Sequence, residues 1–142
     1  MDSLLNIFYA GMAVYGFRQW RSGPEGGALR ITHWPLRRHV FALLTIAALS
    51  LANAFILRRF TAAAWPFLDS LVTWSSVFTT YLVTRKVHEN WTWWLVIDSV
   101  SLGLYASRGL YVTALLFAGY LVLIVIGIRE WRRAETVQYA AA

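Results

Sequence analysis

The sequence contains no cysteine, and only 14% of its 142 residues are charged. Without cysteine the chain can form no disulfide, no thiolate metal site and no thiol-based catalytic centre. Soluble domains carry about 25% charged residues, so this low charge content, beside 58% apolar residues, indicates an integral membrane protein. No secretory signal peptide is expected, because Asp2 follows Met1 with neither a basic region nor a small-residue cleavage site.

Sequence motifs of enzymes are missing as well. The chain has no glycine-rich phosphate loop, no Walker pattern and no nucleophile elbow, which disfavours an ATP-driven pump and an integral membrane enzyme. His33, His39 and His88 have no ligand spacing to one another or to carboxylates, so neither a metal site nor a cofactor is expected. The net charge of +6 does not indicate nucleic-acid binding, because the basic residues lie between apolar segments, where helix ends meet lipid head groups.

Five apolar segments are long enough to cross about 30 Å of hydrocarbon as helices. They span approximately 3–19, 39–57, 64–84, 91–107 and 110–128. The segment 21–38 is rich in Gly, Pro and Arg and predicts a flexible connector. Arg108 and Gly109 permit only a tight hairpin, which makes the last two helices antiparallel neighbours. The predicted fold class is an all-α integral membrane protein.

One stretch of the sequence occurs twice. Residues 2–21 and 113–132 share 8 identities in 20 positions, and both end in Gly-x-Arg-x-Trp-Arg. Internal repeats of this kind are typical of transporters. The second copy ends a complete three-helix repeat, whereas the first copy is only the last helix of an incomplete one. The predicted parts are that last helix, a cytoplasmic loop, a linker helix, the complete repeat and a cytoplasmic tail (1–20, 21–38, 39–60, 61–133 and 134–142).

The distribution of Lys and Arg predicts the orientation in the membrane. Ten lie on the side that contains the C-terminus, and three on the other (Arg58, Arg59 and Arg108). By the positive-inside rule the C-terminus is cytoplasmic and the N-terminus lies outside. The two repeat helices are then parallel, and two helices of the first repeat are missing. We expect a truncated gene or gene model in preference to a short chain that completes its bundle by oligomerising.

Polar and aromatic residues follow one face on each of two predicted helices. Asp69, Thr73, Ser76 and Thr80 recur at helical spacing on the first, and Trp91, Trp94, Asp98 and Tyr105 on the second. An intramembrane carboxylate needs an aqueous cavity or a partner. Indole rings, hydroxyls, a carboxylate and the amide of Asn90 would together suit a flat heterocycle joined to a sugar, including a cationic ring.

Structural explanations compete with this interpretation. Tryptophans at the ends of membrane helices are often interfacial anchors, which applies to Trp91 and Trp93. Serine and threonine hydroxyls in such helices commonly bond to the i−4 carbonyl. Asp69 lies near the first turn of its helix, where a carboxylate can simply stabilise the helix N-terminus. Asp98 is in the middle of its helix, which favours a functional or bundle-organising role.

These residues resemble the PnuC-type vitamin transporters, whose best-known members carry nicotinamide riboside. The resemblance is strongest from Phe67 to Trp131, in Asp69-x-x-x-Thr73, Asn90-Trp91-x-x-Trp94-x-x-x-Asp98 and Gly127-x-x-x-Trp131. It implies a protomer of three plus one plus three helices, like that of the SWEET sugar transporters, usually trimeric and moving a vitamin by facilitated diffusion. This chain lacks the first two helices of that pattern.

The resemblance implies that Asn90, Trp91, Trp94 and Asp98 contact the substrate, with Asp69, Thr73, Thr80 and Tyr105 as further pocket residues. Many family members have Gln where this chain has Thr80, which leaves the identity of the vitamin open. The expected function is uptake of nicotinamide riboside, an NAD precursor, across the bacterial inner membrane. Thiamine or riboflavin is the alternative cargo, and a truncated protein that transports nothing is the alternative from another class.

Overall fold

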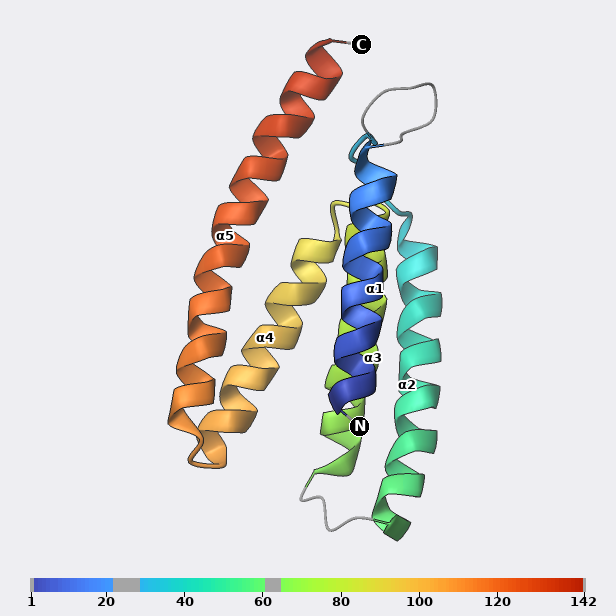
Figure 1. Cartoon of the computed structure of the whole chain (residues 1–142), viewed down its shortest axis with the longest axis vertical. Helices are drawn as coiled ribbons and strands as arrows, with labels where there is room; N and C mark the ends of the chain where they lie inside the picture. Colours follow the sequence, from blue (N-terminus) through green and yellow to red (C-terminus); the bar gives the residue numbers. More distant parts are fainter. Residues whose placement is uncertain (1, 22–28, 61–64, 142) are drawn as a thin grey trace.

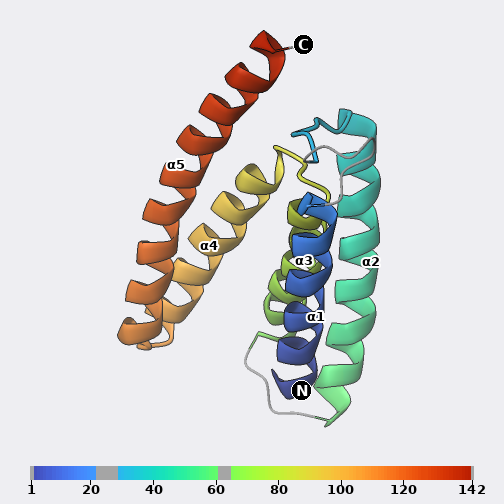
Figure 2. The same cartoon turned by 45° about the horizontal axis from the view of Figure 1, so that its top comes forward.

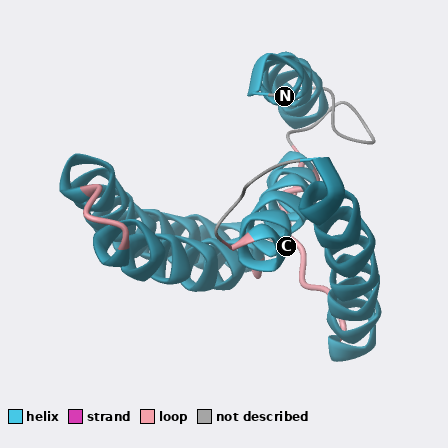
Figure 3. Cartoon of the chain, turned by 90° about the horizontal axis from the view of Figure 1, so that it is seen from below, coloured by secondary structure: helices cyan, strands magenta, loops and turns pink. Residues whose placement is uncertain are grey.

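The computed structural model describes residues 2–21, 29–60 and 65–141 of the chain. Within these residues the chain forms five helices: α1 (Asp2–Arg21), α2 (Leu36–Phe60), α3 (Pro66–Thr84), α4 (Asn90–Ser107) and α5 (Tyr111–Ala140). Each of the five predicted spans is therefore a helix (Figure 3). The largest difference lies at the end of α5, which continues well past the predicted boundary at residue 128.

Helix α3 lies in the middle of the fold. It contacts α1, α2 and α4, while α5 packs on α4 (Figures 1 and 2). Pro66 begins α3, where its missing N–H is not needed for helical hydrogen bonding. Gly109 adopts a positive φ of 74° between α4 and α5, a conformation that glycine reaches without strain. The predicted tight, antiparallel hairpin is confirmed.

Burial along the helices is reversed relative to a soluble protein. Large apolar side chains face outward, with Phe41 73% and Leu115 73% exposed. The buried positions are instead rich in small polar residues, namely Ser50, Ser70, Ser75, Thr79, Thr84 and Ser101. Small polar residues at helix contacts and apolar residues outside are typical of helices packed within lipid. The amide of Asn53 on α2 donates a 3.1 Å hydrogen bond to Ser70 on α3, which joins these two helices.

Two of the described helices are long and apolar enough to cross a membrane by composition and length alone. They are Leu36–Arg59 and Tyr111–Ala140, with mean hydropathies of 2.3 and 2.4. The sequence predicted five such spans. Within the described ranges α1, α3 and α4 do not meet this criterion, because hydroxyls, carboxylates and indoles lower their mean hydropathy. These three helices are joined through α3.

The two ends of the helical assembly differ in charge. At one end of the assembly α1, α3 and α5 finish and α2 and α4 start, and we call this end the basic end. Its Lys and Arg residues are Arg18, Arg21, Arg30, Arg37, Arg38, Arg85, Lys86, Arg129, Arg132 and Arg133. The opposite end has Arg58, Arg59 and Arg108. The predicted separation of charges between the two faces is therefore present in the fold.

The connector between α1 and α2 is packed at its second half. Thr32 forms a parallel β-bridge with Val87. The Thr32 N–H donates a 3.1 Å hydrogen bond to the Lys86 carbonyl, and the Thr32 carbonyl accepts a 2.9 Å hydrogen bond from the His88 N–H. Ile31 is only 4% exposed. The predicted connector over 21–38 therefore has backbone pairing at Thr32 and a buried side chain at Ile31, and its last three residues belong to α2, while residues 22–28 lie outside the described part.

The predicted tail at 134–142 is an extension of α5 as far as Ala140. The side-chain amide of Gln138 accepts a 2.9 Å hydrogen bond from the Ile31 N–H and donates a 3.1 Å hydrogen bond to the Ile31 carbonyl. This pair imitates the bonds that a neighbouring strand would make. The last turns of α5 are therefore attached to the connector at the basic end.

Candidate functional site

A cavity of about 370 Å³ lies between α3, α4 and α5. Its wall combines aromatic rings, one carboxylate and three hydroxyls with apolar side chains. The lining residues are Val72, Ser76, Trp91, Trp94, Ile97, Asp98, Ser101, Phe117, Tyr120, Leu123 and Ile124. The volume falls in the range of about 300–1,000 Å³ that is usual for small-molecule sites, which are mostly apolar with a few polar groups.

A second cavity, of about 400 Å³, continues from the first toward the basic end. It is lined by Trp20, Thr80, Val83, Asn90, Trp91, Trp94 and Trp131. Because Trp91 and Trp94 belong to both walls, their indoles stand between the two cavities. We refer to the pair as the paired cavity. Of the eight sequence-predicted substrate contacts, the paired cavity brings together Asn90, Trp91, Trp94, Asp98 and Thr80.

The ring of Trp91 is held against the backbone of α5. A Cβ placed on Gly127 would lie 2.1 Å from Cη2 of this ring, so only glycine allows the indole to come so close. The ring also meets Trp131 edge-on, with 5.5 Å between centroids and an interplanar angle of 89°. Its Nε1 is buried, and this donor lacks a hydrogen-bond partner within the described part of the chain.

Asp98 is the one carboxylate in the wall of the paired cavity. The residue is only 5% exposed, and it makes no hydrogen bond or ion pair within the described part of the chain. One helical turn away, Ser101 is fully buried, and its Oγ has no hydrogen-bond partner there. A buried charge is costly unless it is paired. A cationic or hydrogen-bonding ligand would supply the missing partner for both groups.

Asn90 presents an amide to the second cavity. The residue is fully buried, and its Nδ2 donates a 2.6 Å hydrogen bond to the Val87 carbonyl. Its Oδ1 is buried with no hydrogen-bond partner among the described residues. The bond to Val87 fixes the amide, so Oδ1 can accept a hydrogen bond from a hydroxyl in the cavity.

The remaining predicted contacts lie outside both cavities. Asp69 forms an ion pair with Arg108 at the opposite end, at 3.2 Å, so that carboxylate is engaged with the α4–α5 hairpin. Tyr105 stacks on Phe117 with centroids 5.4 Å apart. Thr73 Oγ1 donates to the Asp69 carbonyl at 2.8 Å. Thr80 does line the second cavity, but its hydroxyl donates to the Ser76 carbonyl at 2.8 Å. Both threonine hydroxyls thus make the hydrogen bond to the i−4 carbonyl that is common in membrane helices.

Several wall residues were not among the predicted contacts. Trp20 and Trp131 close the basic end of the second cavity, with ring centroids 6.0 Å apart, and Trp20 Nε1 donates a 3.2 Å hydrogen bond to the Val83 carbonyl. Phe117 and Tyr120 contribute the α5 side of the first cavity. The repeated Gly-x-Arg-x-Trp-Arg was the signal for the two tryptophans, since it places an indole at the same position of both repeat helices.

A larger depression lies on the other side of α3. It measures about 880 Å³ and is bordered by α1, α2 and α3, with Phe41, Trp74 and Phe78 among its lining residues. Its polar groups are the hydroxyls of Thr45 and Tyr81, the indole N–H groups of Trp34 and Trp74 and, near the basic end, Arg37 and Arg38; its wall contains no carboxylate. Of these groups, Trp74 Nε1 is buried without a hydrogen-bond partner among the described residues. Greater size does not make it the better site, because it lacks convergent polar groups that could orient a ligand.

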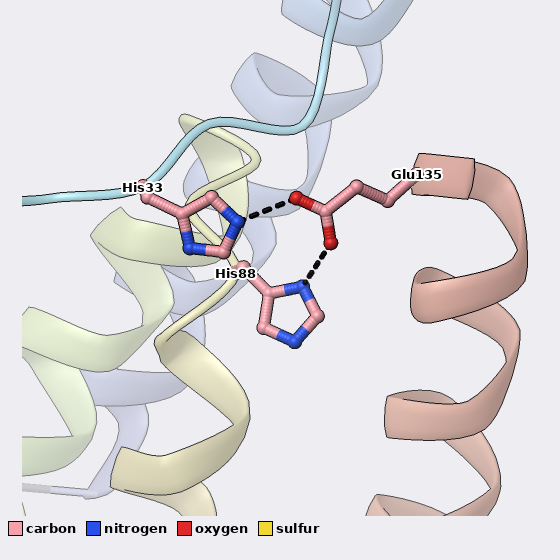
Figure 4. A group of neighbouring side chains, drawn as sticks. All are labelled: His33, His88 and Glu135. Carbon is pink, nitrogen blue, oxygen red and sulfur yellow. Dashed lines mark hydrogen bonds and ion pairs between the residues drawn. The ribbon is translucent and has the colours of Figure 1, made fainter. Parts of the chain in front are cut away.

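A polar cluster occupies the basic end, outside the paired cavity. His33 lies between two carboxylates, with Nδ1 2.7 Å from Glu89 Oε1. Its Nε2 lies 2.5 Å from Glu135 Oε1 (Figure 4). Hydrogen bonds to Glu135 and then to Glu89 raise the pKa of His33. Partial burial alone would raise the pKa of Glu89, but hydrogen bonds from His33 and from backbone N–H groups lower it. Sequence spacing gave no sign that these residues meet.

The comparison with protein families and with curated proteins points to one group. The family model described as nicotinamide mononucleotide transporter matches residues 1–133. The nicotinamide riboside transporter PnuC of Escherichia coli strain K12 is 26% identical over 154 residues, covering 90% of this chain and 64% of that protein. The riboflavin/roseoflavin transporter RibM of Streptomyces davaonensis is 25% identical, covering 84% of this chain and 58% of that protein.

A solved structure shares the fold. The crystal structure of the vitamin B3 transporter PnuC matches with a TM-score of 0.68 at 18% identity, covering 90% of this chain and 59% of that chain. The chain thus spans less than two thirds of the length of these relatives.

Proposed function

This chain belongs to the nicotinamide mononucleotide transporter family, and on that premise we propose that it takes part in facilitated uptake of nicotinamide riboside, a precursor of NAD. The family is one of membrane transporters and not of enzymes, so the chain is an integral membrane protein. The observation that carries the proposal is the paired cavity, in which two indoles and an unpaired, buried carboxylate border the same space.

Each part of the cavity suits one part of this substrate. Nicotinamide riboside consists of a positively charged pyridinium ring joined to ribose. The faces of Trp91 and Trp94 can stack on the ring, and Asp98 provides the opposite charge within a largely apolar wall. Asn90 Oδ1, Ser101 Oγ and the Trp91 N–H can bond to the carboxamide and the ribose hydroxyls. These groups are charge and hydrogen-bond partners for the substrate, and no covalent chemistry is required.

The substrate contacts that we propose are Asn90, Trp91, Trp94, Asp98 and Ser101, with Thr80 in the wall. Asp69, Thr73 and Tyr105 are not included, because they lie outside the paired cavity and have protein partners. The relative RibM, by its name a riboflavin and roseoflavin transporter, makes riboflavin the second candidate cargo. Riboflavin is neutral, so the unpaired carboxylate of Asp98 favours the cationic nicotinamide riboside.

Location and assembly complete the proposal. The chain would reside in the bacterial inner membrane with its basic end in the cytoplasm, since basic residues are retained on that side. By resemblance we expect a homo-oligomer, namely a trimer, surrounded by lipid. Rocking of one helical repeat against another requires a second repeat, so binding and transport are measured separately in the test below.

The test uses the purified chain, with binding of labelled nicotinamide riboside measured in nanodiscs and its uptake measured in liposomes. Thiamine and riboflavin serve as competitors. We expect saturable uptake above that of empty vesicles, and stronger competition from a cationic ring than from a neutral one. Folded protein that neither binds nor moves any of the three compounds would refute the proposal. Binding without uptake would identify the non-transporting alternative.

The decisive variant is Trp94→Ala. It removes a ring that borders both cavities and should abolish binding and uptake, while helix content stays unchanged. Trp65→Ala is the matched control, because this indole is 54% exposed and lies outside the paired cavity. If the two variants take up substrate equally well, Trp94 is an interfacial anchor and not a substrate contact.

A further inference from the structure

The β-bridge at the basic end places two histidines side by side. Thr32 and Val87 are paired in parallel, so the residues that follow them, His33 and His88, project on the same side of the bridge. Their rings accordingly lie with centroids 5.2 Å apart and planes inclined by 23°. Two imidazole rings from segments far apart in the sequence thus lie next to each other.

A carboxylate from a third segment meets both rings (Figure 4). Glu135 on α5 places Oε1 2.5 Å from His33 Nε2 and Oε2 3.2 Å from His88 Nδ1. Ligand atoms of the three side chains all lie within 4.8 Å of one another. A zinc ion needs each ligand atom about 2.0–2.2 Å away, so closing around one requires side-chain movement of about 1 Å.

The Nδ1 atom of His88 makes no hydrogen bond within the described residues. This atom is buried, and although it is close to Glu135, the two do not meet with acceptable hydrogen-bond geometry. Its side chain is only 16% exposed, so water does not readily serve as a substitute. A buried nitrogen without a hydrogen bond calls for an explanation. A lone pair directed at a shared cation would provide one.

A fourth residue orients His33 in the way that metal sites require. Glu89 Oε1 lies 2.7 Å from His33 Nδ1, and Glu89 Oε2 accepts a 3.2 Å hydrogen bond from the Trp34 N–H. Histidines that bind metals typically donate their second ring N–H to a carboxylate, which fixes the ring and the tautomer. Glu89 therefore holds a proton on Nδ1, so that Nε2 becomes the ligand once the proton that it shares with Glu135 is released to solvent.

We propose that His33, His88 and Glu135 bind a divalent transition-metal ion of the zinc class, with Glu89 as the residue that positions His33. Two imidazole nitrogens and one carboxylate oxygen are a zinc ligand set, and water would complete the coordination. Binding displaces the proton between His33 Nε2 and Glu135, since the ligating imidazole must be neutral. The ion would tie the connector and the α3–α4 loop to α5.

The position of the cluster allows such an ion to reach it. The 30 residues of α5 extend for about 45 Å at about 1.5 Å per residue, which is longer than a hydrocarbon core of about 30 Å. The last turns, which include Glu135, therefore extend past the hydrocarbon at the basic end. His33 has 49% of its side chain exposed, so the cluster opens to the aqueous side.

In the experiment, zinc chloride is titrated into the purified, tag-free chain in nanodiscs, and the heat of binding is measured by isothermal titration calorimetry. A polyhistidine tag must be absent because it would itself bind zinc. We expect one ion per chain with micromolar or tighter affinity. X-ray absorption of the zinc-loaded chain should show two imidazole ligands at about 2.0 Å.

The variants separate this site from any other. Glu135→Gln and His88→Asn should each weaken binding at least tenfold, and Glu89→Gln should weaken it by about 10–100-fold through loss of orientation. His39→Asn is the control, since His39 accepts a hydrogen bond from Trp93 Nε1 outside the cluster and should bind zinc as before. Circular dichroism verifies that each variant is folded.

Two results would overturn the proposal. The first concerns the unaltered chain and needs no variant. It is zinc binding with a dissociation constant of about a millimolar or weaker, or an X-ray absorption spectrum that shows no imidazole ligands. The other is unchanged affinity in folded Glu135→Gln and His88→Asn chains. Either outcome would mean that the cluster only holds α5 in place through hydrogen bonds. Neither outcome depends on whether the chain transports nicotinamide riboside.

Discussion

Replacing Gly127 by alanine would place a methyl group inside the ring of Trp91. The added Cβ would lie 2.1 Å from Cη2, 2.4 Å from Cζ3 and 2.6 Å from Cζ2. Carbon atoms in contact stay about 3.5–4.0 Å apart, so the ring must retreat by about 1.4 Å or more. Overpacking of this kind costs about 1–3 kcal/mol. Alanine returns up to about 1 kcal/mol through its better helix propensity.

The displaced ring is a wall of both cavities, so the proposed substrate should bind more weakly even if the fold is kept. A loss of about 1–2 kcal/mol of binding free energy through the shifted ring corresponds to about a 5–30-fold loss of affinity. The measurement is binding of labelled nicotinamide riboside in nanodiscs, together with the midpoint of thermal unfolding. We expect Gly127→Ala to lower both the affinity and the midpoint.

A matched glycine on the same helix provides the control. A Cβ on Gly119 would meet nothing within 4 Å, so Gly119→Ala should be neutral or slightly stabilising. In a Trp91→Phe background the smaller ring should make Gly127→Ala less costly, which a double-mutant cycle detects as coupling. Equal behaviour of the two alanine variants would mean that the contact between Trp91 and α5 has been wrongly placed.

Three further predictions concern other parts of the fold. Asp98→Asn keeps the shape of the side chain but removes its charge, so uptake of labelled nicotinamide riboside should fall at least about tenfold while competition by neutral riboflavin persists; equal loss for both would argue against charge recognition. Gln138→Ala leaves both backbone groups of buried Ile31 without their side-chain partner, which should cost about 1–2 kcal/mol and speed hydrogen exchange of the Ile31 amide; unchanged exchange would contradict the fastening of α5. The partly exposed pair between Asp69 and Arg108 should show a coupling of only about 0–1 kcal/mol in a double-mutant cycle of thermal unfolding; a much larger value would indicate a buried role.

The helices could be predicted from the sequence because their signals are local. Runs of apolar residues and Gly109 in the hairpin each act within a few positions, and the helices and the tight turn predicted from them are present. The resemblance to PnuC-type transporters was confirmed by the family match over residues 1–133. The end of α5 was missed because hydropathy marks where the hydrocarbon ends, whereas the helix continues through good helix formers to Ala140.

The site was only partly predictable, because a helical stripe extends along the whole helix but a cavity touches part of it. Ser76 and Thr80 border the paired cavity, whereas Asp69 on the same stripe lies at the opposite end beside Arg108. The histidine cluster was beyond sequence reasoning for a different reason. The Thr32–Val87 bridge joins segments 55 positions apart, and no local pattern indicates such a pairing.

Trp131 lies between the two proposed sites. Its ring meets Trp91 at 5.5 Å in the wall of the paired cavity and the ring of His88 at 6.4 Å in the polar cluster. One indole therefore separates a molecule stacked on Trp91 from an ion held by His88. If one occupant moves Trp131, it changes the binding free energy of the other. Thermodynamic linkage makes this change in binding free energy equal in both directions. If both proposals hold, the second copy of the repeated tryptophan couples binding of the vitamin to binding of the metal.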